Sequence, residues 1–203
     1  FQVSNTESES SWGEFFLSLK ERGLKDVHLV TSDNHKGLVN AVRRHFQGAT
    51  WQRCQTHFSR NMLDNAPKAL QSEIKEDLRK LYEAVDLDSA RKVKDQIIDK
   101  YETKASKAAT LLDDAFYDIT AVLAIPLKYR KRLRTTNGVE RLNQEVRRRE
   151  RVIRIFPNEA SVIRLMGALL MEQDEKWQTG RKYFDMDLYY QAMKKGPKDT
   201  AAA

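Results

Sequence analysis

Two short segments that indicate strands alternate with two amphipathic segments near the start of the chain, and this order restricts the fold more than any other feature of the sequence. Residues 27–32 (VHLVTS) and 49–53 (ATWQR) have the length and composition of buried strands. Residues 12–19 and 35–46 each place their apolar side chains on one helical face. A helix, strand, helix, strand order predicts a parallel α/β sheet.

The pattern changes after residue 57 and becomes purely helical. Apolar residues recur at helical spacing in three successive stretches, residues 70–85, 93–101 and 111–123, and the last stretch stops before Pro126. We therefore expect a partial sheet domain over residues 1–57 and an all-helical insertion over residues 58–126.

The last third of the chain predicts three further helices. Residues 127–180 are expected to hold a basic helix and then a long helix capped by Asn158, whose Leu and Met residues are most simply core. Residues 181–203 are expected to form a short helix near residues 188–193 and a tail. The predicted fold class is thus α/β but predominantly helical, and 40% hydrophobic residues are enough to bury one sizeable core.

Residues 128–154 concentrate the positive charge of the chain. This stretch holds eleven Lys and Arg residues against three Glu, a net charge of +8, whereas the whole chain carries +7. The basic character therefore forms one patch and is not a property of the general surface. Because the patch lacks the aromatic and leucine face of a membrane-surface helix, it favours nucleic acid as the partner and excludes a membrane.

The residues expected to contact the DNA backbone come from this patch. They are Arg130, Lys131, Arg132, Arg134, Arg141, Asn143, Arg147, Arg148 and Arg151. Cationic contacts of this kind give an affinity that falls with salt and carries little sequence information. We expect Arg148→Ala to weaken binding to all sequences and to lower the salt slope by about one.

Two acidic residues each admit two interpretations. Asp33 follows the first predicted strand, and Glu140 follows a turn inside the basic patch. Either residue could cap a helix: Asp33 or the neighbouring Asn34 could cap the helix that follows, and Glu140 could complete a capping box with Asn137. Either could instead bind a metal ion, because ligand groups gather at the carboxyl ends of parallel strands and because Glu140 shares a helical face with Asn143 and Arg147. Mg²⁺ or Mn²⁺ prefers such carboxylates, and phosphoryl transfer on DNA commonly uses two such ions.

Cys54 and His57 form a Cys-x-x-His pair. A structural zinc site needs four ligands, so a single cysteine makes that interpretation weak and favours a packed cysteine beside a histidine near the active region. The single cysteine also excludes an internal disulfide and fits a reducing compartment. No signal peptide and no apolar run near the roughly 20 residues of a membrane span is found, so we expect a protein of the cytoplasm.

Four segments together resemble the Mutator-type transposases of bacterial insertion sequences. They are residues 31–38 (TSDNHKGL), 51–61 (WQRCQTHFSRN), 135–143 (TTNGVERLN) and 156–161 (FPNEAS). The resemblance implies a ribonuclease-H-like catalytic domain of the DDE type, with three acids and a helical insertion between the second and the third. Asp33 matches the second acid and Glu140 the third, while Cys54 and His57 match the family's Cys-x-x-His signature.

The resemblance also implies an activity. It predicts a nucleoid-associated enzyme, with a homodimer as one option, that cleaves DNA at terminal inverted repeats and transfers the strands to target DNA. The first acid of the family lies on an opening strand that this chain does not include, so we expect a C-terminal portion of the catalytic domain that is inactive by itself. Two alternatives stay open: a DNA-binding or assembly module in which both acids cap helices, and a nuclease of the same fold.

Overall fold

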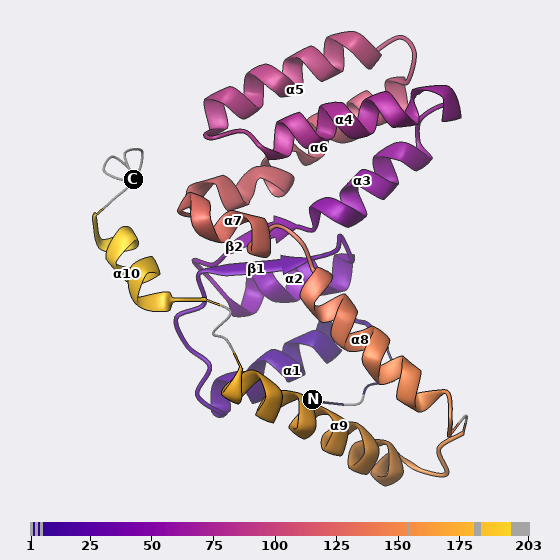
Figure 1. Cartoon of the computed structure of the whole chain (residues 1–203), viewed down its shortest axis with the longest axis vertical. Helices are drawn as coiled ribbons and strands as arrows, with labels where there is room; N and C mark the ends of the chain where they lie inside the picture. Colours follow the sequence, from indigo (N-terminus) through magenta and orange to yellow (C-terminus); the bar gives the residue numbers. More distant parts are fainter. Residues whose placement is uncertain (1, 3, 5, 154, 181–183, 196–203) are drawn as a thin grey trace. The chain divides into compact units, whose positions relative to one another are not determined.

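The computed structural model describes residues 2, 4, 6–153, 155–180 and 184–195 (Figure 1). The chain divides into two compact units. Residues 8–136 form the sheet unit, and residues 137–203 with residues 1–7 form the hairpin unit. Arg154, at the end of the basic stretch, and the predicted tail from residue 196 lie outside the described residues.

The sheet unit contains the predicted pair of parallel strands. Strand β1 (Leu29–Ser32) pairs with β2 (Thr50–Arg53) in the register Leu29 with Thr50 and Ser32 with Arg53. Helix α1 (Glu9–Glu21) precedes the first strand, and α2 (Lys36–His45) connects the two. This confirms the predicted order and a predominantly helical α/β fold.

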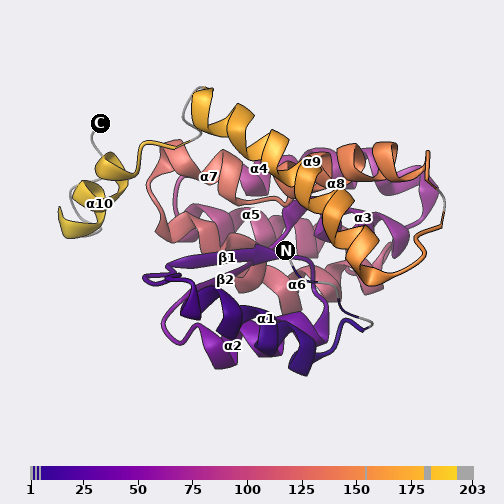
Figure 2. The ribbon, with the colours of Figure 1, turned by 90° about the horizontal axis from the view of Figure 1, so that it is seen from below.

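Helices α1 and α2 pack together on one side of the strands, as Figures 1 and 2 both show. Their contact is an aromatic cluster in which the rings of Phe16 and Phe46 lie 4.8 Å apart, with Trp51 of β2 also buried. The apolar faces predicted for residues 12–19 and 35–46 are thus confirmed, since they supply most of this core.

The start of α2 differs from the prediction. Neither Asp33 nor Asn34 caps the helix; its N-cap is His35, whose Nδ1 accepts a hydrogen bond from the amide of Leu38 at 3.4 Å. The helix begins at Lys36, and an N-cap must stand immediately before the first helical residue, so both earlier residues fall outside the capping position.

Helices follow the second strand over the segment predicted as an all-helical insertion. This segment consists of α3 (Gln55–Asp64), the 3-10 helix η1 (Lys68–Leu70), α4 (Gln71–Tyr82), α5 (Leu87–Tyr101), α6 (Ser106–Thr120) and the 3-10 helix η2 (Ala121–Ala124). Its core is built from fully buried side chains of α3 to α6, such as Phe58, Leu78, Tyr101 and Leu112. Val85 was predicted on this apolar face but is 63% exposed, because α4 already ends at Tyr82.

A buried carboxylate joins α4 to α5. Asp77 accepts hydrogen bonds from Lys80 at 2.8 Å, Lys100 at 2.6 Å and the hydroxyl of Tyr101 at 2.9 Å. Burial alone would raise the pKa of Asp77, but the hydrogen bonds, led by Lys100, outweigh it and lower the pKa to about 2.

Asp77→Asn is expected to reduce the free energy of unfolding by about 2 kcal/mol at pH 7. Since the pKa of Asp77 is lowered from 3.8 to about 2 on folding, this stabilisation is present above about pH 4 and is lost as the pH falls toward 2. Urea unfolding between pH 2 and pH 7 measures it. The exposed Asp99→Asn is the control; equal effects of the two changes would contradict the role of Asp77.

The basic stretch forms two helices. Helix α7 (Leu127–Leu133) belongs to the sheet unit, and α8 (Asn137–Glu150) is the first helix of the hairpin unit. Helices α9 (Glu159–Thr179) and α10 (Met186–Lys195) follow. The predicted cap of α9 is confirmed, because the side chain of Asn158 accepts from the amide of Ser161 at 2.9 Å.

The prediction that the Leu and Met residues of α9 form a core is wrong among the residues that the structure describes. No residue of α9 is buried, and Met171 and Trp177 are 67% and 60% exposed. Helix α8, which faces α9, also buries no described residue, and the two helices share the ion pair between Arg149 and Glu172. Among the described residues, no helix combines the length and the apolar character needed to cross a bilayer.

Candidate active site and nucleic-acid interface

The carboxyl ends of the two strands carry Asp33 and Cys54. Asp33 follows β1 directly and is exposed, and no described residue forms an ion pair or a hydrogen bond with its carboxylate. Cys54 follows β2 and is completely buried, and its amide donates to the carbonyl of Ser32 at 2.7 Å. The structure therefore places a free carboxylate at the edge where ligands of parallel sheets gather.

A segment from a distant part of the sequence is fastened to this edge. We call residues 133–136 the strap. The hydroxyl of Thr31 donates to the carbonyl of Leu133 at 2.6 Å, and the amide of Gln55 donates to the carbonyl of Arg134 at 3.0 Å. Sequence analysis gave no indication of these contacts, because they join residues about 80 to 100 positions apart.

Cys54 provides the last attachment of the strap. Its Sγ accepts two hydrogen bonds from Thr136, one from the amide and one from the hydroxyl, both at 3.4 Å. The packed cysteine that the sequence favoured is thus confirmed, and its thiol is free. His57, one helical turn later, is half-buried on α3.

Two buried glutamines, which sequence analysis missed, fix this edge to the helical insertion. Gln52 is fully buried in β2, donates to the carbonyl of Ile119 at 3.0 Å and accepts from the amide of Val122 at 2.7 Å. Gln55 donates to the same carbonyl of Ile119 at 2.8 Å. The only signal in the sequence is a polar residue where a buried strand would have an apolar one.

Glu140 lies in the first turn of α8 and is half-buried. Asn143 and Arg147 follow it at helical spacing and are exposed, as expected for one polar face. The structure brings Asp33 and the strap together in the sheet unit, whereas Glu140 belongs to the hairpin unit. The meeting of the two acids therefore stays a prediction.

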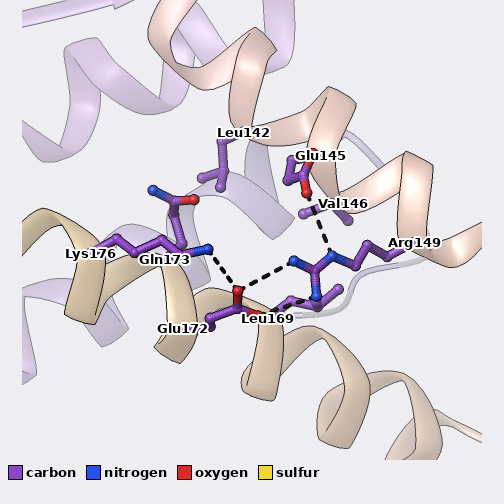
Figure 3. Close-up of a pocket in the computed structure, with 8 residues that line it drawn as sticks. All are labelled: Leu142, Glu145, Val146, Arg149, Leu169, Glu172, Gln173 and Lys176. Carbon is purple, nitrogen blue, oxygen red and sulfur yellow. Dashed lines mark hydrogen bonds and ion pairs between the residues drawn. The ribbon is translucent and has the colours of Figure 1, made fainter.

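The other face of α8 lines a cavity against α9, with a volume of about 320 Å³ (Figure 3). Leu142 and Val146 are half-buried and line it, whereas Val139 is 60% exposed. Val139 lies one turn before Leu142 and two turns before Val146, and it is not among the residues that line this cavity.

Two arginines of α8 form ion pairs at or near this cavity. Arg148 is a predicted DNA contact, and Arg149 is its neighbour. Figure 3 shows Arg149 between Glu145, at 3.5 Å, and Glu172, at 3.2 Å. Arg148 pairs with Glu145 at 2.6 Å, and this hydrogen bond lowers the pKa of Glu145 to about 2. A phosphate that binds Arg148 has to compete with Glu145.

Two predicted DNA contacts on and after α7 have internal roles. The guanidinium of Arg130 donates to the carbonyls of Ile125 at 2.7 Å, Val85 at 2.7 Å and Leu123 at 2.9 Å. Burial lowers the pKa of this guanidinium. Arg134 donates to the carbonyl of Tyr82 at 3.0 Å.

The remaining predicted contacts are exposed. Lys131 and Arg132 lie on α7, and Arg141, Arg147 and Arg151 lie on or just after α8. They leave a strongly cationic surface on each of these two helices.

The sequence matches the transposase family described as "Transposase, Mutator family" over residues 1–180, and the chain belongs to this family. The transposase for insertion sequence element IS256 in transposon Tn4001 of Staphylococcus aureus is 45% identical over 190 residues, 92% of this chain and 48% of that protein. The transposase for element ISRM5 of Rhizobium meliloti is 39% identical over 92% of this chain and 47% of its own length.

A third relative agrees with these two. The transposase for element IS1081 of Mycobacterium tuberculosis is 39% identical over 94% of this chain and 46% of its own length. The chain thus spans about half the length of these relatives, and the resemblance to insertion-sequence transposases seen in the motifs is confirmed.

Proposed function

We propose that this chain is part of the catalytic domain of a DNA transposase that cleaves DNA at the terminal inverted repeats of its element and joins the strands to target DNA. Membership of the Mutator family supports DNA transposition. The ribonuclease-H-like fold, the DDE-type site with Asp33 and Glu140, and a first acid supplied by a longer protein are further parts of this proposal. We also propose a cytoplasmic, nucleoid-associated protein that acts as a homodimer.

The strap is the observation that carries the proposal. It fastens residues 133–136 to the carboxyl ends of β1 and β2, where Asp33 lies. Glu140 is four residues beyond Thr136, and four residues of fully extended chain reach at most about 14 Å. Chain connectivity therefore limits how far Glu140 can lie from this edge, although 107 positions separate it from Asp33.

The available donors fit a hard divalent ion. The carboxylate of Asp33 is exposed and has no described partner, and both proposed ligands offer oxygen, which Mg²⁺ and Mn²⁺ prefer. The chemistry that such an ion supplies is polarisation of a phosphoryl oxygen and stabilisation of the leaving oxygen. The residues of this chain would hold the ion and orient the DNA backbone beside it.

Removal of divalent ions is expected to abolish the activity of the full-length transposase that contains this chain. EDTA should stop both cleavage of inverted-repeat ends and strand joining, and Mg²⁺ or Mn²⁺ should restore both. Gel analysis of labelled end DNA with a target plasmid measures the two products. Joining in EDTA would contradict the proposed site, and cleavage without any joined product would favour a nuclease.

The exposed cations of α8 are proposed as contacts to the DNA backbone. Asn143 and Arg147 share the helical face of Glu140, Arg141 is the next residue along the helix, and Arg151 follows its end. Lys131 and Arg132 provide a second group on α7. Such contacts position the duplex, and they carry no base sequence directly.

Arg147→Ala is expected to lower the slope of log K against log salt by about one, because it removes one phosphate contact. Arg148→Ala removes the same charge from the same helix, but its side chain is paired with Glu145, so its effect should be smaller. Fluorescence anisotropy with duplex DNA at several salt concentrations measures both slopes. Equal slopes for the two variants would show that the Glu145 pair does not keep Arg148 from the backbone.

A further inference from the structure

The strap is held by two side chains that the proposed chemistry does not use. Thr31 in β1 donates to the carbonyl of Leu133, and Cys54 at the end of β2 accepts from the amide and hydroxyl of Thr136. Both contacts lie inside the sheet unit. They flank the backbone hydrogen bond between Gln55 and Arg134. Three of the four strap residues, Leu133, Arg134 and Thr136, are therefore anchored.

The place of the strap in the chain gives these anchors a consequence. Thr136 is the last residue before α8, which begins at Asn137, and Glu140 lies in the first turn of that helix. The first residues of a helix fix its starting point, so the anchors also restrict where the first turn of α8 can lie. Asp33 follows β1 two residues after Thr31, so the same strand ends carry one proposed ligand and the anchors of the other.

The chemistry of the anchors suits a positioning role. Cys54 is completely buried, and its sulfur is a weak hydrogen-bond acceptor in the position where the strap presents two donors. The hydroxyl of Thr31 is half-buried, and its bond to Leu133 at 2.6 Å is short. Thr31 is half-buried and Cys54 is completely buried, and both bind the strap directly.

We propose that Thr31 and Cys54 are positioning residues that hold the strap and thereby set the start of the helix that carries Glu140. The inference rests on the proposed function for its catalytic consequence, but the anchoring itself can be measured without activity. It assigns a role to the cysteine of the Cys-x-x-His pair that involves no metal.

Hydrogen exchange on the chain tests the anchoring. Cys54→Ala should raise the exchange rate of the Thr136 amide and of the first amides of α8 by about three- to tenfold, because one hydrogen bond is worth about 1 kcal/mol. Thr31→Val keeps the shape of the side chain, removes its hydroxyl and should give a similar increase over residues 133–136. Amides of the insertion core, such as that of Leu112, should be unchanged.

Two outcomes would overturn the anchoring. One is unchanged exchange of the strap in both variants. The other is a uniform increase over the whole sheet unit, which would indicate a general loss of stability. If Cys54→Ala alone fails to fold, Thr31→Val still decides the question, because it alters a different anchor of the same strap.

Activity of the full-length transposase tests the catalytic consequence. Each variant should lower kcat for end cleavage about tenfold with KM for DNA unchanged, and should raise the Mg²⁺ concentration needed for half-maximal rate. Thr31→Ser should restore the rate, since it restores the hydroxyl. Full activity with a loosened strap would overturn the positioning role, whereas a fully active Glu140→Gln would overturn the proposed function and leave the exchange result standing.

Discussion

Glu140→Gln in the full-length transposase is expected to lower the rate of end cleavage by about 10³-fold, equivalent to about 4 kcal/mol of transition-state stabilisation. Glutamine keeps the shape and the helix propensity of the side chain but removes the negative charge that a divalent ion requires. The fold and the affinity for DNA should therefore stay the same. Cleavage of a labelled inverted-repeat end in Mg²⁺ and binding of the same DNA measure the two effects separately.

Glu150→Gln is the matched control for this variant. Glu150 is an exposed acid at the end of the same helix, so its replacement removes the same charge from α8 at a distance from the strap. It should cleave at the wild-type rate. Full activity of Glu140→Gln would reject Glu140 as a ligand, and would favour a DNA-binding or assembly module in which this acid only caps α8.

The strands and the helices that follow them could be predicted because their signals are local. Residues 29–32 and 50–53 lie in short segments flanked by helical patterns, and both strands formed where expected. Boundaries were less certain, since His35 competes with Asp33 and Asn34 for the cap of α2. Any of the three can end a loop, and only the exact start of the helix selects one.

The candidate site could be predicted as a set of residues but not as a geometry. The acids Asp33 and Glu140 were found by motif, and nothing in the sequence showed that Thr31 and Cys54 bind the segment before α8. Those bonds depend on a hydroxyl and a thiol meeting backbone groups of the strap, which neither periodicity nor charge reveals. For α9 the sequence predicted a buried face that the structure does not show. The spacing of its apolar residues predicts burial whether or not a partner is present.

The basic patch shows the same limit. Eleven cations within residues 128–154 suggest one surface with one role, yet the structure divides them. Arg148 is paired with an acid, whereas Arg130 and Arg134 bind backbone carbonyls. Sequence alone cannot separate these uses, because unpaired carbonyls at helix ends leave no trace in the pattern of charges.

Arg130→Ala is expected to reduce the free energy of unfolding by about 3 kcal/mol, because it leaves the carbonyls of Ile125, Val85 and Leu123 without this donor. Leu123 and Ile125 stand at the end of the insertion and Val85 lies in the loop before α5, so the guanidinium joins these two places. Arg130→Lys should recover only part of the loss, since a single ammonium cannot reproduce the planar fork of donors. Urea unfolding monitored by circular dichroism measures the change.

Lys131→Ala is the matched control, because Lys131 is the next residue of α7, carries the same charge and is exposed. It should change stability by less than about 0.5 kcal/mol, as expected for a surface substitution. DNA binding should show the reverse order of effects. Lys131→Ala should lower the salt slope of binding, and folded Arg130→Ala should leave that slope unchanged. A lowered slope with full stability in Arg130→Ala would return Arg130 to the DNA surface and would mean that its three bonds to the backbone contribute little to the fold.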